Sequence, residues 1–424
     1  MKNSNIQWIG KIPDDWEVSK FKYVSTIYTG NSIKDEHKSN YESSEDARPY
    51  ISSKDIDVHT GNVDYNNGLY IKKDDFTFRV ARKGCSLMCI EGGSAGKKKA
   101  LINQDVSFVN KLCCFQSNGK IDERFLYYYL CNPSYEEEFR NNISGMIGGV
   151  SVSVLKNFVI LVPPLPTQTS IATYLDAKCS EIDGLIADIN KQIETLNELK
   201  KSTITEAVTK GLNKNAKLKD SGIQWIGMIP EGWRVSRVKY LLIERKNYSI
   251  YGEEESLSMS QKYGLIPTSE MENVPHQAAT LVGSKIANVG DLVFNKLKAH
   301  LGVFSVSKYY GLVSPDYAVY YSNGKSDVKY LEFLFKTQLY ISQFKKLITG
   351  VGAGLSRLYT SDLYSIHSIY PPLTEQHAIA TYLDTKCSEF DSIISDKQKQ
   401  ISTLEAYKKS LIYEYVTGKK QLDI

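Results

Sequence analysis

The sequence lacks any long uninterrupted apolar stretch. No run among its 424 residues approaches the ~18 consecutive apolar residues that a membrane-spanning helix requires. Residues 1–5 (MKNSN) also lack the apolar core of a secretory signal peptide. We therefore expect a cytoplasmic protein with no membrane partner.

Cysteine and histidine are too scattered for a metal site or a disulfide framework. The seven cysteines form no CxxC pair, and none has a histidine beside it at ligand spacing. The six histidines form no visible cluster with a serine or cysteine. We expect no metal ligands and a reducing environment, in which Cys179 and Cys387 pack as small apolar residues.

The charge balance permits nucleic-acid binding without arguing for it. The net charge is +4, and the apolar and charged fractions of 42% and 24% are ordinary for a globular protein. Local clusters of cations therefore matter more than the total charge. The length of 424 residues exceeds one core and predicts several folded units.

What the sequence does contain is an internal repeat. The pentapeptide IQWIG occupies residues 6–10 and again residues 223–227. A second block, IATYLD, occupies residues 171–176 and 379–384, and a PPL tripeptide precedes each copy. The segments between these blocks differ. The chain thus holds two copies of one scaffold with different inserts, which suits a molecule that grips two different targets.

Each copy ends in a predicted long helix with an apolar stripe. The apolar residues recur at steps of three and four, the spacing of a helix that lies along another helix. We expect Thr167 and Thr374 to be the N-caps, the first helix to extend to about Thr209, and Gly211 and Gly418 to mark the helix ends. The stripe of the helix seam consists of Leu175, Ile182, Ile186, Ile189, Ile193 and Leu196 in the first helix and Leu383, Phe390, Ile394, Ile401 and Leu404 in the second.

The expected fold class is α+β, with two mixed α/β domains in a pseudo-two-fold internal repeat, joined and spaced by two long antiparallel α-helices. Proline-rich breaks and a polar linker give the boundaries. Residues 1–166 form the first domain, 167–212 the central helix, 213–373 the second domain and 374–424 the C-terminal helix. The two stripes most simply bury each other as a coiled coil; the alternative is that each packs only on its own domain.

Two catalytic motifs are incomplete. Residues 92–98 (GGSAGKK) resemble a phosphate-binding loop, but only three residues separate the outer glycines and a lysine replaces the hydroxyl residue that binds magnesium. Asp316, Asp327 and Lys329 match the PD…(D/E)xK spacing of metal-dependent nucleases. The first copy has Lys111 at the position of Asp316. We therefore expect no catalytic residue in this chain and keep the nuclease as an alternative.

The remaining signals fit DNA binding. Small residues allow close approach to a phosphate backbone, ammonium groups attract phosphates, and Gln and Lys can read base edges. Both inserts carry such a cluster, and both copies have a glycine-rich loop, at residues 145–149 and 350–354. A solvated loop without a ligand is the alternative for each cluster. The candidate DNA-binding residues are Gly93, Ser94, Lys97, Lys98, Lys99, Ser260, Gln261, Lys262, Tyr263, Lys296, Lys298, His300 and Arg357.

In the order and duplication of these segments, the chain resembles the specificity subunits of type I restriction-modification systems. The carrying features are the two IQWIG…IPxxW entries and the PPLxxQ segments at residues 163–168 and 371–376, each followed by its IATYLD helix. Residues 290–297 (GDLVFNKL) and 312–317 (LVSPDY) also resemble the second insert of that family. The resemblance covers essentially the whole chain.

The resemblance implies that each insert is a target recognition domain, which reads one half of an asymmetric bipartite site in double-stranded DNA. It implies a helix pair that spaces the halves and docks two modification (methyltransferase) subunits, with restriction (ATP-dependent motor and nuclease) subunits joining the complex. S-adenosylmethionine, ATP and Mg²⁺ would bind to those partners, and no cofactor to this chain. The alternatives are the metal-dependent nuclease and a coiled-coil scaffold without DNA binding.

Overall fold

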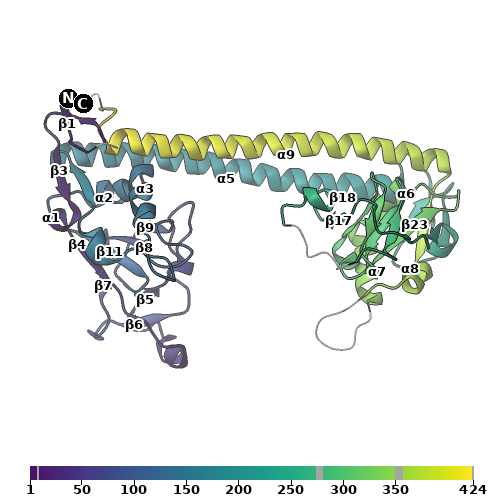
Figure 1. Cartoon of the computed structure of the whole chain (residues 1–424), viewed down its shortest axis with the longest axis horizontal. Helices are drawn as coiled ribbons and strands as arrows, with labels where there is room; N and C mark the ends of the chain where they lie inside the picture. The colour runs from purple at the N-terminus through teal and green to yellow at the C-terminus, as the bar shows by residue number, and fades with distance from the viewer. Residues whose placement is uncertain (7–8, 274–279, 349–356, 423–424) are drawn as a thin grey trace. The chain divides into compact units, whose positions relative to one another are not determined.

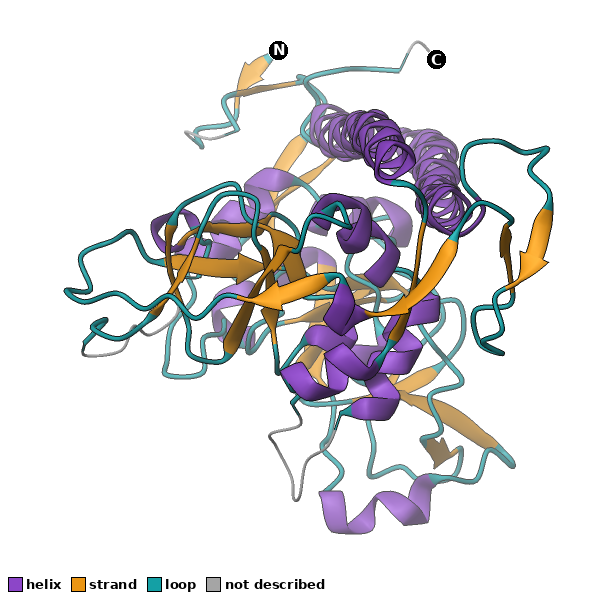
Figure 2. Cartoon of the chain, turned by 90° about the vertical axis from the view of Figure 1, so that its right-hand side faces the viewer, coloured by secondary structure: helices purple, strands orange, loops and turns teal. Residues whose placement is uncertain are grey.

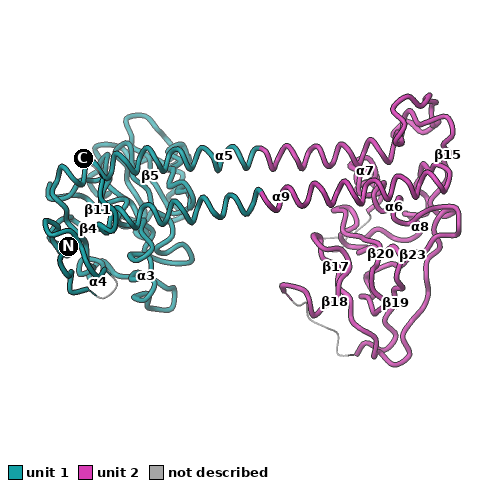
Figure 3. The backbone as a smooth tube through the Cα atoms, turned by 90° about the horizontal axis from the view of Figure 1, so that it is seen from above, with its two compact units in different colours: residues 1–191, 397–424 teal, residues 192–396 magenta. Residues whose placement is uncertain are grey.

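The computed structural model describes residues 1–6, 9–273, 280–348 and 357–422. The chain forms two compact units, one made of residues 1–191 with 397–424 and one of residues 192–396 (Figure 3). Each unit holds one globular domain together with part of each long helix. We call the globular parts domain 1 and domain 2.

Domain 1 mixes short helices with two four-stranded sheets. Its elements are β1 (Lys2–Asn3), β2 (Lys11–Ile12), β3 (Glu17–Lys20), α1 (Phe21–Val24), β4 (Ser25–Thr29), η1 (Asp35–Tyr41), β5 (Ala47–Ile51), η2 (Ser53–Asp55), β6 (Tyr70–Lys72), β7 (Val80–Ala81), β8 (Ser86–Cys89), β9 (Lys99–Leu101), β10 (Val106–Phe108), β11 (Leu112–Ser117), α2 (Glu123–Leu130), α3 (Pro133–Asn141), α4 (Val152–Leu155) and β12 (Val159–Val162). One sheet is antiparallel in the order β4-β11-β8-β9. The other has the order β6-β5-β10-β7 and contains the parallel pair β5 and β10.

Domain 2 repeats much of this plan. Figure 2 shows how helices, strands and loops are mixed in the chain. The elements of domain 2 are β13 (Leu218–Asp220), β14 (Met228–Pro230), β15 (Arg234–Arg237), η3 (Val238–Tyr240), β16 (Leu242–Glu244), β17 (Leu257–Ser260), β18 (Gly264–Pro267), η4 (Thr268–Glu270), β19 (Lys285–Ala287), β20 (Leu292–Asn295), η5 (Ala299–Leu301), β21 (Phe304–Val306), β22 (Gly311–Val313), β23 (Tyr317–Ser322), α6 (Val328–Phe335), α7 (Gln338–Leu347), α8 (Thr360–Ser365) and β24 (His367–Tyr370). Its antiparallel sheet, β16-β23-β20-β21, corresponds strand for strand to β4-β11-β8-β9. The pairs β17-β18 and β19-β22 occupy the place of the second sheet of domain 1, so the two inserts differ there.

The repeated sequence blocks form the same local structures in both copies. The two entry segments form the hairpins β1-β2 and β13-β14, in which Ser4 N–H donates to the carbonyl of Gly10 at 2.9 Å and Ser221 N–H to that of Gly227 at 3.0 Å. The pairs β3-β12 and β15-β24 are both antiparallel and match four residues with four. The predicted internal repeat is therefore a repeat of structure.

Two long helices dominate the remainder of the chain (Figure 1). Helix α5 spans Leu165–Lys210 and helix α9 spans Leu373–Val416. Both begin before the predicted caps Thr167 and Thr374, so the N-cap predictions were wrong. Pro166 is tolerated in the first turn because the N–H groups there have no helical acceptor and the fixed φ of proline suits a helix.

The predicted glycine ends are confirmed. Gly211 and Gly418 follow α5 and α9 with φ of +78° and +68°, a conformation that suits a residue without a Cβ. Each also lies close to an aromatic ring of the neighbouring domain. A Cβ on Gly418 would approach Trp16 to 3.2 Å, and one on Gly211 would approach Trp233 to 3.3 Å.

Within each unit the two long helices run antiparallel. In the first unit, Lys408 Nζ pairs with Asp183 Oδ2 at 2.6 Å and the rings of Tyr174 and Tyr415 lie 4.7 Å apart, so residue numbers rise along α5 as they fall along α9. In the second unit, Lys200 Nζ pairs with Asp391 Oδ1 at 2.7 Å. Among the described residues, no helix is long and apolar enough to cross a membrane.

The apolar stripe packs on both the other long helix and the globular domain. Leu175 belongs to a core cluster that also contains Phe125 of domain 1 and Leu411 of α9, and Leu383 belongs to one with Tyr330 of domain 2 and Val208 of α5. The stripe residues Leu175, Ile182 and Leu383 are buried, whereas Ile186, Ile189, Ile193, Leu196, Phe390, Ile394, Ile401 and Leu404 are half-buried. The stripe thus combines the two packing modes that the sequence left open.

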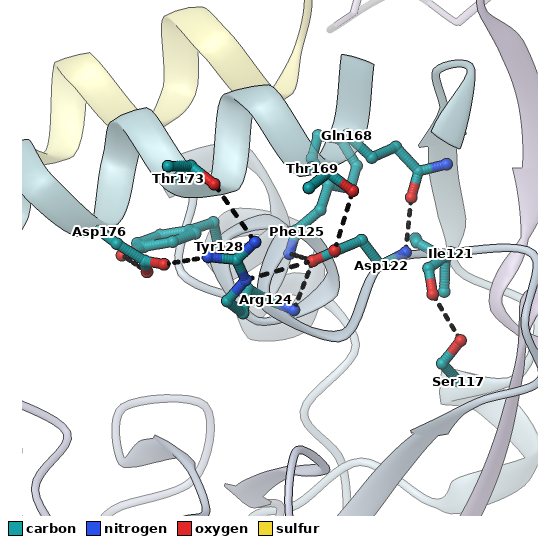
Figure 4. A network of polar contacts seen from close by, with 10 residues as sticks. All are labelled: Ser117, Ile121, Asp122, Arg124, Phe125, Tyr128, Gln168, Thr169, Thr173 and Asp176. Atoms are coloured by element: carbon teal, nitrogen blue, oxygen red, sulfur yellow. Dashed lines mark hydrogen bonds and ion pairs between the residues drawn. The ribbon is translucent and has the colours of Figure 1, made fainter. Parts of the chain in front are cut away.

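A buried glutamine ties the start of α5 to domain 1. The side-chain oxygen of Gln168 accepts a hydrogen bond from Asp122 N–H at 2.7 Å (Figure 4), and its amide nitrogen donates to the carbonyls of Pro163 at 2.7 Å and Lys120 at 3.3 Å. Asp122 is itself the N-cap of α2. One side chain therefore joins the proline turn, α5 and the start of α2.

The same junction recurs at the start of α9. Gln376 accepts from Asp327 N–H at 2.8 Å and donates to the carbonyls of Pro371 at 2.8 Å and Lys325 at 3.3 Å. Asp327 caps α6 in the same way. This geometry explains why both PPLxxQ segments contain a glutamine at the same place.

The aspartate of the first IATYLD block pins α2 to α5. Asp176 accepts a hydrogen bond from the hydroxyl of Tyr128 at 2.7 Å and pairs with Arg124 at 2.7 Å (Figure 4). Asp384 is its counterpart in the second copy, and its Oδ1 atom lies 3.5 Å from Nζ of Lys329. The second copy therefore keeps the ion pair with a lysine in place of arginine.

We predict that Gln168→Leu lowers the free energy of unfolding by roughly 2–4 kcal/mol, because it leaves an amide N–H and backbone carbonyls without partners in a buried site. Urea denaturation followed by circular dichroism measures the change. Gln104→Leu, at an exposed position in domain 1, is the control and should stay within ~0.5 kcal/mol of the parent. Equal losses for both variants would contradict this account of the junction.

A half-buried carboxyl group lies in α3. Burial raises the pKa of Glu138 from 4.5 to about 7, and its Oε2 has no hydrogen-bond partner among the described residues. Between these two pH values the folded state holds a proton that the unfolded state has released. The carboxyl group therefore opposes folding increasingly as the pH rises through this window.

We predict that stability falls between pH 4.5 and about 7 through this group and that Glu138→Gln flattens that part of the profile and stabilises the protein at pH 8. Thermal unfolding across the pH range tests this. Glu137→Gln, on the exposed face of the same helix, should leave the profile unchanged. A Glu138→Gln profile that parallels the parent would refute the assignment.

Candidate nucleic-acid interface

Three loops of domain 1 meet at one backbone junction. Ile90, after β8, donates its N–H to the carbonyl of Lys111 at 3.0 Å, and Val150 donates its N–H to the carbonyl of Ile90 at 3.0 Å. The β8-β9 loop, the turn before β11 and the segment that precedes α4 are thereby held together. This junction is where the glycine loop and the lysine triplet begin.

The corresponding loops of domain 2 meet in the same way. Lys296, after β20, donates its N–H to the carbonyl of Asp316 at 3.1 Å, and Leu358 donates its N–H to the carbonyl of Lys296 at 3.0 Å. The backbone hydrogen bonds of the junction are thus the same in both domains, whereas the residues that make them have different side chains. Sequence comparison of the two copies had aligned Lys111 with Asp316, and the hydrogen bonds confirm that alignment.

The lysine triplet of domain 1 does not act as one cluster. Lys97 is exposed, and its ammonium donates to the carbonyl of Gly93 at 3.3 Å. Lys98 is half-buried and donates to the carbonyl of Ser53 at 2.8 Å. Lys99 is only 5% exposed.

The ammonium of Lys99 lies 2.5 Å from Glu136 of α3, and this ion pair joins β9 to α3. The structure therefore brings Lys97 and Lys98 to the surface together and places Lys99 in a structural ion pair. Lys97 and Lys98 lie in the loop before the strand, whereas Lys99 begins β9, where its side chain is held against α3 by the ion pair.

The glycine loop forms a tight turn on this junction. Ala95 N–H donates to the carbonyl of Gly92 at 2.9 Å, and Lys97 N–H donates to the carbonyl of Ser94 at 3.1 Å. The N–H groups of Ala95 and Lys97 are thus used within the loop and do not converge on a common anion. This agrees with the incomplete phosphate-loop motif in the sequence, and Gly93 and Ser94 remain at the rim of the junction.

Sequence reasoning missed a neighbouring loop. A shallow cavity of about 470 Å³ lies beside Lys98 and carries several further polar side chains. The cavity is lined by Lys54, Asp55, Ile56, Asp57, Val58, Asn62, Val63, Asp64 and Lys98. Of these, Lys54 and Asn62 are exposed and of the residue types that contact phosphates and base edges. A lone lysine and a lone asparagine in a turn-rich stretch give no sequence signal.

The loop that carries Asn62 is well ordered by local contacts. Asp57 accepts hydrogen bonds from Thr60 N–H at 2.8 Å and His59 N–H at 3.0 Å, and the bonds from Thr60 and His59 keep the pKa of its carboxyl below the ordinary value. The hydroxyl of Tyr127, on α2, would lie 2.6 Å from a Cβ placed on Gly61. The loop is therefore seated directly on α2.

In domain 2 the junction carries charged side chains. Arg357 pairs with Asp316 at 2.9 Å, and the ammonium of Lys296 donates to the carbonyl of Pro315 at 3.1 Å. Burial, followed by the positive charge of Lys285, lowers the pKa of Lys296. The structure thus brings two candidates, Lys296 and Arg357, into one cluster around Asp316.

The other two candidates of this loop, Lys298 and His300, differ in their exposure to solvent. Lys298 is exposed, whereas His300 is half-buried in η5, which packs against α7. The Nδ1 atom of His300 and the Nε atom of Arg357 are buried and have no hydrogen-bond partner among the described residues. Residues 350–354, the second glycine-rich loop, lie outside the described residues.

The candidates Ser260, Gln261, Lys262 and Tyr263 form the turn between β17 and β18. The hydroxyl of Ser260 accepts hydrogen bonds from the N–H groups of Lys262 and Tyr263 at 3.3 Å each. The ammonium of Lys262 lies 4.7 Å from the centre of the Tyr263 ring, and Gln261, Lys262 and Tyr263 are all exposed. This turn presents an amide, a cation and an aromatic ring on a rigid hairpin.

The nuclease motif does not assemble. Asp316 pairs with Arg357, Asp327 caps α6 by accepting from Tyr330 N–H at 2.8 Å, and Lys329 pairs with Glu332 at 3.1 Å. The six-residue strand β23 separates the two aspartates and spans about 20 Å. Within the described ranges, no three acidic, His or Cys side chains are grouped to hold a metal ion.

Comparisons with known proteins agree with this architecture. Residues 13–195 match the family model of the type I restriction modification DNA specificity domain. The type I restriction enzyme MjaVIII specificity subunit of Methanocaldococcus jannaschii is 26% identical over 437 residues, which cover 96% of this chain and 94% of that protein.

Two solved structures share the fold along nearly the whole chain. One, from a study of complex assembly and conformational transition of the type I restriction-modification system, has a TM-score of 0.71 at 15% identity and covers 97% of this chain and 100% of its own. The other, the HsdS subunit from Thermoanaerobacter tengcongensis, has a TM-score of 0.52 at 16% identity and covers 97% and 98%. Residues 13–195 thus match the type I restriction modification DNA specificity domain, and along nearly its whole length the chain is similar to type I restriction enzyme specificity subunits.

Proposed function

We propose that this chain is the non-catalytic DNA specificity subunit of a type I restriction-modification complex and recognises an asymmetric bipartite site, one half per domain. The observation that carries the proposal is the three-loop junction, which has the same backbone hydrogen bonds in both domains but different side chains. Equivalent frames place recognition residues similarly, and different residues read different bases.

We propose residues 1–166 and 213–373 as the two target recognition domains and residues 167–212 and 374–424 as the spacer helices. Two modification subunits dock on this framework and restriction subunits join the complex. S-adenosylmethionine, ATP and Mg²⁺ belong to those partners. The complex acts on cellular DNA, so we place the chain in the cytoplasm.

The exposed cations set the proposed mode of binding. In domain 1, Lys54 and Lys98 line one cavity, and Lys97 is exposed on the adjoining loop. These three cations contact phosphates, while Asn62 reaches a base edge. In domain 2, Gln261, Lys262 and Tyr263 form the reading tip, because a glutamine amide can bind adenine and a lysine can bind guanine. Lys296, Lys298 and Arg357 form its phosphate-facing side.

We expect the chain, coexpressed with a modification subunit from a type I system in a host without adenine methylation, to direct N6-methylation to one asymmetric motif with two short blocks and an unread gap. Sequencing that detects N6-methyladenine reads the motif. A complex that forms but methylates no motif would contradict the proposed function and favour a scaffold without DNA binding.

We expect Lys97→Met to weaken DNA binding without changing stability, and Lys99→Met to lower the free energy of unfolding by about 2 kcal/mol because Glu136 loses its buried partner. The salt dependence of binding separates the two roles, since each lost phosphate contact reduces the slope of log K against log salt by about 0.9. A slope change with Lys99→Met at unchanged stability would reverse the assignment.

A further inference from the structure

A short hairpin in domain 1 exposes two large apolar side chains at its tip. Ser144 and Gly149 exchange backbone hydrogen bonds at 2.9 and 3.0 Å, and Gly148 N–H donates to the carbonyl of Gly145 at 3.2 Å. At the turn, Met146 is fully exposed and the exposed fraction of Ile147 is 68%. Neither side chain contributes to the core of domain 1.

The hairpin is anchored to the three-loop junction. Gly92 N–H, from the glycine loop, donates to the carbonyl of Gly148 at 2.8 Å. A Cβ on Gly149 would lie 2.8 Å from the carbonyl oxygen of Ile90, so this close approach requires glycine. The next residue, Val150, is only 2% exposed. The tip is therefore presented by a fixed base.

Exposed cations lie on the segments that hold the apolar tip, and we call them its cationic border. Arg140 is exposed at the end of α3, and its carbonyl accepts a hydrogen bond from Ile143 N–H at 3.3 Å, where the hairpin begins. Lys97 and Lys111 are exposed on the two loops of the junction that hold the hairpin. Glu91 is the acidic residue bonded to it, through a backbone bridge to Gly149, and is half-buried.

An apolar tip with a cationic border matches the chemistry of duplex DNA more closely than that of an apolar protein groove. Cations hold the phosphates on both sides of a base step, and an apolar side chain between them can enter the step and unstack it. Such an insertion needs a rigid base. A flexible loop would have to become ordered on binding, and the entropic cost would offset the free energy gained by the insertion.

We propose that Met146 and Ile147 form a wedge that enters one base step of the DNA half-site bound by domain 1 and unstacks it. This inference rests on the proposed function and adds a mode of recognition to it. Bases at the wedged step are then selected by how easily they unstack, and pyrimidine–purine steps are the easiest to deform.

The test uses the complex of this chain with its modification subunits and a duplex that carries the mapped methylation motif. Single 2-aminopurine substitutions are placed in turn through one half-site and then the other, away from the methylated adenines. We expect a rise in fluorescence at one step of one half-site with the parent complex. We expect Met146→Ala with Ile147→Ala to abolish that rise and weaken binding about tenfold, a net loss of about 1.4 kcal/mol, because the contacts of the inserted side chains outweigh the cost of unstacking.

Met228→Ala is the matched control, because Met228 is 52% exposed on β14 of domain 2. It should keep both the fluorescence and the affinity. A 2-aminopurine at the methylated adenine reports base extrusion by the modification subunit and should respond equally in the parent and the double variant.

The outcomes separate the two proposals. A parent complex that does not bind the mapped duplex would overturn the proposed function along with the wedge. A parent complex that binds without any fluorescence rise outside the methylated adenine, or a double variant that binds like the parent, would overturn the wedge alone. A double variant that no longer assembles with the modification subunits would also overturn it, since the tip would then be a protein contact.

Discussion

A buried glutamine joins the first turn of each long helix to its domain, and both the oxygen and the nitrogen of its side-chain amide are hydrogen-bonded. Gln168 and Gln376 each accept one backbone N–H and donate to two backbone carbonyls, all in the turn before α2 or α6 and in the proline turn before the helix. Because a buried amide without partners is costly, these bonds fix where the helix starts and how α2 or α6 lies beside it. The packing of the apolar stripe on its domain depends on this fixed start.

The duplicated backbone supports the proposal that one chain recognises two different half-sites. The antiparallel sheet, the capped helices α2 and α6 and the three-loop junction occur in both domains with matching hydrogen bonds. The side chains on that frame diverge: Ile90 and Lys111 of domain 1 stand where Lys296 and Asp316 stand in domain 2. A stable frame allows the exposed side chains of its loops to change without loss of the fold, since those side chains are not packed in the core.

Burial decides which charges are available to a ligand. The three consecutive lysines of domain 1 are chemically alike, yet Lys97 is exposed, Lys98 lines a cavity and Lys99 is paired with Glu136. A charge removed from water is retained only with a partner, and the buried ion pair of Lys99 serves to hold β9 against α3. The candidate nucleic-acid interface therefore excludes Lys99, although the sequence suggests all three lysines. It also includes Lys54 and Asn62, which the sequence did not indicate.

The sequence by itself determined the duplication, the two long helices and their glycine ends, because these depend on local patterns: repeated words, apolar spacing and residues that favour or break a helix. It misplaced the N-caps at Thr167 and Thr374, since α5 and α9 both begin earlier, and in α5 a proline in the first turn costs no hydrogen bond. The tertiary structure alone decided the partners of Gln168 and Lys99, the separation of Asp316 from Asp327 and the junction of Ile90, Lys111 and Val150. These contacts join residues that are far apart along the chain, and local spacing carries no information on which distant backbone groups will meet.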